Sequence, residues 1–203
     1  MSERAARSPA LAWLAAATFG ALALAAEAAF RTPWLKPSAE RSPFSWAAAV
    51  TILFGAGCAA VLARRNRRWQ RVLLATVLVW IGLDEAFGLH ERFAADLDAR
   101  RVGLGWSGVA LAVVALLYGA AALLLALEAR LGRESMLVAG VGLLAVSLTG
   151  RLGGGALAAL HHLPGGDPRD VGEATTGGMA LSGWVLVAAA LLARVRARAP
   201  IMR

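Results

Sequence analysis

Long apolar segments recur along the chain and limit what it can fold into more than any other feature. Six can be read, at residues 9–30, 44–63, 72–93, 106–127, 135–160 and 171–193. At 1.5 Å per residue, each is long enough to cross a hydrocarbon core about 30 Å thick. Only 17% of the residues are charged, against about a quarter in soluble domains. No apolar/polar alternation persists, so strands are not expected. The sequence predicts an all-α polytopic membrane protein, a single domain over residues 1–203 with six transmembrane helices in a lipid bilayer.

The basic residues predict the orientation of these spans. They gather at both ends of the chain and between the second and third spans, where the run "RRNRRWQR" occupies residues 64–71. Positive flanks mark the cytoplasmic side, so both termini are expected inside the bacterial cytoplasmic (inner) membrane. The same pattern explains the net charge of +8 without a nucleic-acid partner. A cleaved signal peptide ending near Ala25 also fits the first span, but its apolar run is longer than usual for one.

The stretch "WIGLDEAFGLHERF", residues 80–93, carries acidic residues and a histidine on an otherwise apolar helix. Counting helical rises from the inner flanks places ionisable groups of four spans about 20–31 Å up, in one outer layer. These residues are Glu27, Asp84, Glu85, His90, Glu91, Arg151 and Glu173. The inner half of each span is nearly free of such groups. Charges in hydrocarbon are costly and normally face the bundle interior and pair, so the layer predicts a buried polar cluster.

Several members of this layer have a simpler explanation when taken singly. Glu27, Glu91 and Glu173 lie near the outer interface, where solvation or a favourable place at a helix N-terminus would account for them. Asp84, Glu85 and Arg151 lie deeper. We expect Arg151 to pair with Asp84 or Glu85, because a lone guanidinium at that depth would be too costly.

A continuous third helix would place Asp84 and Glu91 within about 20° of each other, with Glu85 and His90 on either side. No single metal ion can take all four, so other helices would have to supply ligands. Fe, Mn or Zn would suit the carboxylate and imidazole groups. The ligands predicted for such an ion are His90, Glu91, His161 and Glu173. The single cysteine, Cys58, excludes a Cys-based cluster and is expected to be a small buried apolar residue.

Small residues are frequent in the later spans, as in "GVG" at 140–142, "GRLGGG" at 150–155 and "GEATTGGMALSG" at 172–183. Small faces let helix backbones approach closely in lipid, within the chain or with partner membrane proteins. "LDEAFGLHE" together with "GEATTGGM" resembles a group of uncharacterised bacterial multi-pass membrane proteins that carry an Asp-Glu…Leu-His-Glu helix. The resemblance implies the architecture and the place of the site, and no activity. This chain departs from the pattern at Gly172 and Thr176, where acidic residues would be expected.

Three functions remain open on this basis. A structural or accessory subunit of a membrane complex needs only the small-residue faces and short loops. A membrane-embedded, metal-dependent enzyme acting on a lipid-like or apolar substrate would use the outer cluster. A proton-coupled transporter would use Asp84, Glu85 and Arg151 as a relay, although the polar residues stop halfway across. The sequence favours the first, since architecture alone does not establish a function.

Overall fold

The regular structure of the chain is helical throughout the part that the structure describes. The computed structural model describes residues 11–22, 25, 42–89, 92, 106–132, 135–152 and 168–197. Its helices are Leu11–Leu22, α2 (Pro43–Asn66), α3 (Trp69–Phe87), α5 (Trp106–Gly132), α6 (Ser135–Leu152) and α7 (Pro168–Ala197). The all-α prediction is confirmed. By length and composition, α2 and the segment Gly177–Ala197 of α7 are apolar enough to cross a membrane.

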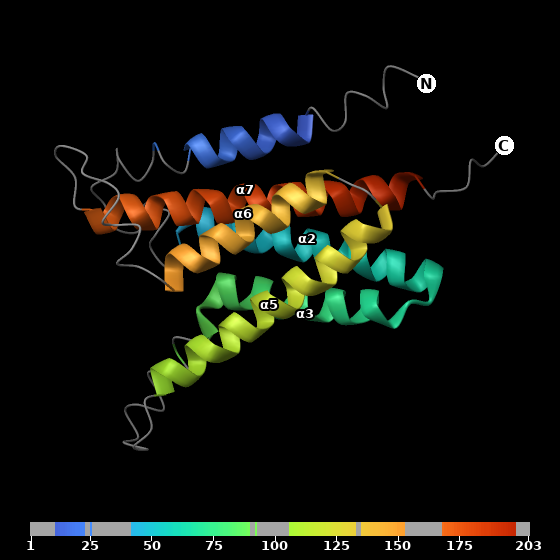
Figure 1. Cartoon of the computed structure of the whole chain (residues 1–203), viewed down its shortest axis with the longest axis horizontal. Helices are drawn as coiled ribbons and strands as arrows, with labels where there is room; N and C mark the ends of the chain where they lie inside the picture. The colour runs from blue at the N-terminus through green and yellow to red at the C-terminus, as the bar shows by residue number, and fades with distance from the viewer. Residues whose placement is uncertain are drawn as a thin grey trace.

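The helices form a bundle in which α7 is central (Figure 1). α2 packs against α3 and α7, α6 packs against α7 and α5, and α3 packs against α5. The helix Leu11–Leu22 lies along α7 (Figure 1). The connection from α2 to α3, the C-terminal end of α5, the N-terminal end of α6 and the C-terminal end of α7 all lie at the same end of the bundle (Figure 1). We call this the basic end, because it contains Arg64, Arg65, Arg67, Arg68 and Arg194.

Local signals fix both ends of α2. Ser42 is the N-cap, and its side chain accepts a hydrogen bond from the Ser45 amide at 3.2 Å. Pro43 follows at the first helical position, where its missing N–H costs no hydrogen bond. The helix ends at Arg67, which has a left-handed φ of 49° and donates its amide to Ala63 O. The chain then turns directly into α3.

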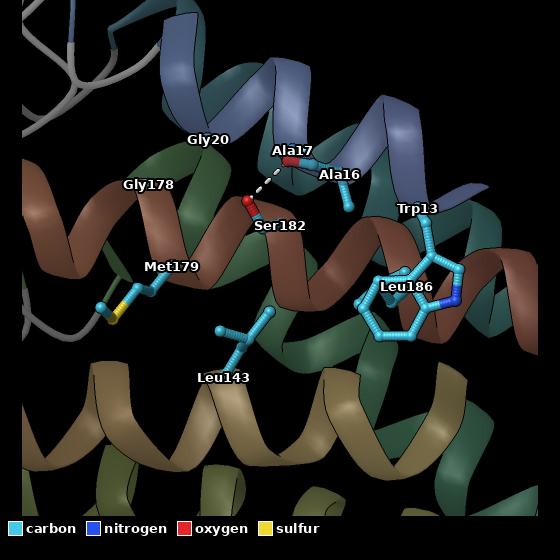
Figure 2. Close-up of a pocket in the computed structure, with 9 residues that line it drawn as sticks. All are labelled: Trp13, Ala16, Ala17, Gly20, Leu143, Gly178, Met179, Ser182 and Leu186. Atoms are coloured by element: carbon cyan, nitrogen blue, oxygen red, sulfur yellow. Dashed lines mark hydrogen bonds between the residues drawn. The ribbon is translucent and has the colours of Figure 1, made fainter. Parts of the chain in front are cut away.

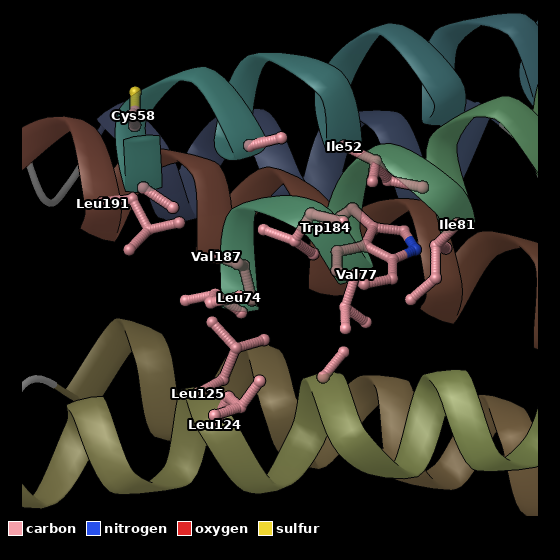
Figure 3. Packing of buried hydrophobic residues seen from close by; sticks show 14 of the residues in the cluster. Ile52, Cys58, Leu74, Val77, Ile81, Leu124, Leu125, Trp184, Val187 and Leu191 are labelled. Carbon is pink, nitrogen blue, oxygen red and sulfur yellow. The ribbon is translucent and has the colours of Figure 1, made fainter. Parts of the chain in front are cut away.

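The core fills the space between α7 and the α2, α3 and α5 helices (Figure 3). Val187 and Leu191 of α7 pack in one cluster with Leu74 of α3 and Leu125 of α5. Cys58 belongs to the same cluster and is 7% exposed, so its prediction as a small buried residue is confirmed. α7 therefore packs against both α2 and α6 and contributes to the shared core.

Two glycines set the closest approach of α6 and α7. A Cβ added at Gly140 would lie 2.9 Å from the carbonyl oxygen of Gly183, and a Cβ at Gly183 would lie 2.9 Å from Gly140 O. The obstructing atoms belong to the backbone and cannot rotate away. Gly142, two residues along α6, would meet nothing within 4 Å. The small residues of the "GVG" segment therefore serve two different surfaces of α6.

We expect Gly140→Leu to destabilise the bundle by about 1–3 kcal/mol or more, because the added side chain forces the two helix backbones apart. The matched variant Gly142→Leu should leave the stability close to that of the wild type. Thermal unfolding of the detergent-purified proteins measures both. Equal melting temperatures for the two variants would contradict the close α6–α7 contact.

Candidate functional site

The third helix is shorter than the sequence indicated. α3 ends at Phe87, and Gly88 takes a left-handed conformation with φ 58° and donates its amide to Asp84 O at 2.7 Å. Glycine adopts this conformation without the steric cost that other residues incur. The prediction of one continuous helix through residue 93 is therefore wrong. The regular helical spacing on which a shared face for Asp84 and Glu91 was expected is interrupted at Gly88.

The acidic pair before this break lies against α5. Asp84 and Glu85 are both half-buried. The hydroxyl of Tyr118 on α5 donates to Glu85 Oε2 at 3.3 Å. The Tyr118 ring in turn meets the Trp184 ring of α7 edge-on, with the centroids 6.1 Å apart. Glu85 is thus turned toward α5 and the interior of the bundle.

The side chains of the other members of the predicted outer cluster lie outside the part of the chain that the structure describes. Glu27, His90, Glu91 and His161 lie outside the described residues. Arg151 and Glu173 belong to α6 and α7 by their backbones, but their side chains are outside the described part. Among the residues that the structure describes, no three His, Cys, Asp or Glu side chains come together to hold a metal ion. The metal site and the pairing of Arg151 remain predictions.

A buried cluster of charges lies at the opposite, basic end of the bundle. Arg71 of α3 binds Glu128 of α5 with two parallel hydrogen bonds, Nε to Oε1 and Nη2 to Oε2, each 2.9 Å long. Arg194 of α7 donates from Nη1 to the same carboxylate and from Nη2 to the Glu128 carbonyl at 2.7 Å. The three residues are 3%, 4% and 8% exposed in the order Arg71, Glu128 and Arg194. We call them the ion cluster.

The ion cluster holds one carboxylate between two guanidinium groups, so it carries one excess positive charge. Arg71 Nη1 is buried and finds no hydrogen-bond partner among the described residues. Both carboxylate oxygens of Glu128 accept charge-assisted bonds, which are about twice as strong as neutral ones. The carboxylate is fully engaged by arginine, which does not release its proton in proteins. This geometry joins helices, and it leaves neither carboxylate oxygen of Glu128 free for acid–base chemistry.

The ion cluster contains arginines that the sequence indicated only as basic flanks of the apolar segments. Arg71 and Arg194 are buried in the bundle. Glu128, just beyond the predicted span 106–127, is buried with them. A sequence signal existed: Glu128 directly follows the apolar run that ends the fourth predicted span. Likewise, Tyr118 is the single tyrosine of the chain and interrupts an apolar helix.

A second contact at the basic end ties α2 to α7. Arg65 Nη1 donates to the Val195 carbonyl at 2.8 Å. Val195 and Arg194 both lie in the last turn of α7, where unsatisfied carbonyls make a cation favourable. Arg65 of α2 and Arg194 of α7 itself therefore both hold the end of α7.

A small apolar pocket lies between the helix Leu11–Leu22 and the α6 and α7 helices (Figure 2). It has a volume of about 250 Å³, with Trp13 at one end and Met179 and Leu143 on the far side. Ser182 Oγ donates to Ala16 O at 2.8 Å. A Cβ on Gly20 would lie 2.6 Å from that hydroxyl oxygen. Small residues thus let the first helix dock on α7 beside the pocket.

Comparison with known proteins gives no assignment. No protein-family model, curated protein or solved structure matches the chain. A functional assignment therefore depends on the chain's own geometry.

Removing Glu128 alone should be far more damaging than removing the whole ion cluster. We expect Glu128→Gln to cost about 3–5 kcal/mol of unfolding free energy, because two buried guanidinium groups lose their counter-charge. The triple variant Arg71→Met, Glu128→Leu, Arg194→Met should recover most of that loss, since similar apolar volumes can replace a buried ion network. Chemical unfolding in detergent measures both.

Arg196→Gln is the matched control for these variants, because Arg196 is exposed on the same turn of α7. It should change stability by less than about 1 kcal/mol. If Glu128→Gln is no more destabilising than Arg196→Gln, the ion cluster does not hold the bundle together.

Proposed function

We propose that the chain is a six-span protein of the bacterial cytoplasmic membrane, with both termini inside, that acts as a structural or accessory subunit of a membrane complex. The observation that carries the proposal is the distribution of polarity. Arg71, Glu128 and Arg194 form a buried ion cluster, whereas large apolar side chains on several described helices face outward. In water this distribution would be inverted.

The outward-facing apolar side chains occur on the helix Leu11–Leu22 and on α2, α3, α5 and α6. Leu116 on α5 is 73% exposed, and Leu14, Val50 and Val138 on three other helices are each at least 60% exposed. Extensive exposed apolar surface marks contact with lipid or with another protein. The apolar helices Leu11–Leu22, 112–128 and 135–147 are shorter than α2 and the apolar part of α7. In our proposal, each of these helices crosses the membrane together with the residues that flank it.

The arrangement of the helix ends supports the orientation. Basic residues gather where α2 turns into α3 and where α7 ends, and these places lie at one end of the bundle (Figure 1). Positive residues are enriched on the cytoplasmic side of short connections. A single orientation of the chain therefore places both groups of basic residues on the cytoplasmic side.

Open glycine positions on the outside support the accessory role. Gly119 on α5 and Gly142 on α6 are exposed, and a Cβ at either position would meet nothing within 4 Å. A partner helix could approach the α5 or α6 backbone closely at these points. By contrast, Gly140 and Gly183 are already used inside the chain.

Site-directed labelling tests the orientation. In a Cys58→Ser background, Arg67→Cys should react with a membrane-impermeant maleimide only after the cells are opened, and Arg92→Cys should react in intact spheroplasts. Both positions are exposed, and the wild-type thiol is buried. Reporter fusions after residues 36, 68, 100, 132 and 166 should alternate, beginning outside. Labelling of Arg67→Cys in intact spheroplasts would overturn the topology.

Gly142→Leu tests the accessory role. In native gels of mildly solubilised membranes, the wild type should migrate in a complex larger than the 21.0 kDa chain. Gly142→Leu should shift it toward the monomer, because the added side chain blocks close helix approach. Elemental analysis of the purified protein is the second readout. A stoichiometric bound metal with no complex would favour the metal-dependent enzyme instead.

A further inference from the structure

A groove runs along the outside of the α2–α3 hairpin. It has a volume of about 740 Å³, within the range of about 300–1,000 Å³ for pockets that hold small molecules. Ala56, Gly57 and Ala60 of α2 form one side, and Val79 and Trp80 of α3 form the other. A Cβ at Gly57 would meet nothing within 4 Å, so the space above this residue is open.

The length of the groove matches the thickness of the hydrocarbon region of one leaflet. It extends along α2 from Arg64, at the basic end, to Leu53. These positions are about 16 Å apart at 1.5 Å per residue. Half of a hydrocarbon core about 30 Å thick is about 15 Å. In the orientation proposed above, the groove spans the inner leaflet from its headgroups to the bilayer centre.

Among the residues that the structure describes, one charged side chain lines the groove, Arg64, and it lies at the headgroup end. Arg64 is exposed, and its guanidinium makes no hydrogen bond to any described residue. Arg65 and Arg71 are neighbours in sequence, but they are committed to Val195 O and Glu128. Thr76, which also lines the groove, donates its hydroxyl to Val72 O of its own helix. The groove therefore combines an apolar trough with one uncommitted cation at its mouth.

We propose that this groove binds an anionic phospholipid of the inner leaflet, with an acyl chain in the trough and the phosphate on the Arg64 guanidinium. Arg67 and Arg68 are exposed on the adjoining turn and add to the attraction for an anionic headgroup. A partner helix is a poorer occupant, because it would bury the Arg64 charge without supplying a phosphate. The placement in the inner leaflet rests on the proposed function, whereas the chemistry of the site does not.

Native mass spectrometry of delipidated protein in detergent tests the proposal. Phosphatidylglycerol should bind more tightly than phosphatidylcholine with the same acyl chains. Arg64→Gln should weaken phosphatidylglycerol binding about fivefold, since one arginine near the headgroups contributes about that factor. Arg196→Gln removes an exposed arginine at the same end but outside the groove, and it should leave binding unchanged.

Filling the trough provides a second, independent variant. Gly57→Leu should abolish the preference for phosphatidylglycerol, whereas Gly119→Leu, which is also open but lies on α5, should not. Both variants should melt near the wild-type temperature, because a Cβ at either position meets nothing within 4 Å. Equal affinities for the two lipids in the wild type, or equal loss in Arg64→Gln and Arg196→Gln, would overturn the lipid site.

The outcomes separate this site from the proposed function. Binding in micelles does not depend on orientation, so reversed maleimide labelling with intact phosphatidylglycerol binding would discard only the topology. Correct labelling without a lipid preference would discard only the lipid site.

Discussion

Three helices of this bundle meet at a single carboxylate, Glu128, and the rest of the arrangement depends on that contact. A planar guanidinium bound through two parallel hydrogen bonds tolerates little rotation or sliding, so Arg71 fixes α3 against α5. Arg194 adds α7 to the same group. The α2 helix follows, because the turn at Arg67 joins it directly to α3. A buried ion network contributes less net stability than its contacts imply. The clearest effect of this network is to fix the register of α3, α5 and α7 relative to one another.

Apolar packing occupies the space between the two polar ends of the bundle. Arg71 and Asp84 are thirteen positions apart on α3, about 20 Å along its axis. The residues between them, such as Leu74, Leu78 and Ile81, are each at most 1% exposed. Close glycine contacts let α6 approach α7 over this region. The ion cluster and the Glu85–Tyr118 contact therefore lie at separate ends, and changes at one should not reach the other through shared partners.

The helices could be predicted from the sequence because apolar run length is a local property. The ends of the helices were harder to predict from the sequence. α2 continues to Asn66 and α7 to Ala197, beyond the apolar runs, because Arg65 and Arg194 find acceptors inside the protein. α3 ends earlier than predicted because Gly88 takes a left-handed conformation. A glycine can adopt this conformation but does not have to, so the sequence alone did not predict the end of the helix. The ion cluster was missed because hydropathy treats arginine as a flank. Its partners are also 57 and 66 positions apart in sequence, and no local pattern connects them.

The arginines of the basic end divide into two groups that sequence counting cannot separate. Arg65, Arg71 and Arg194 are bound to acceptors on other helices and stabilise the fold. Arg64, Arg67 and Arg68 are exposed on the turn between α2 and α3, where their charge acts on the surroundings. In the proposed orientation both contributions lie at the inner face, where the bound group fixes the helices and the exposed group would meet the lipid headgroups. The exposed arginines share no acceptor with the bound arginines. Substituting the exposed ones can therefore alter the proposed orientation and lipid contact without disturbing the bundle.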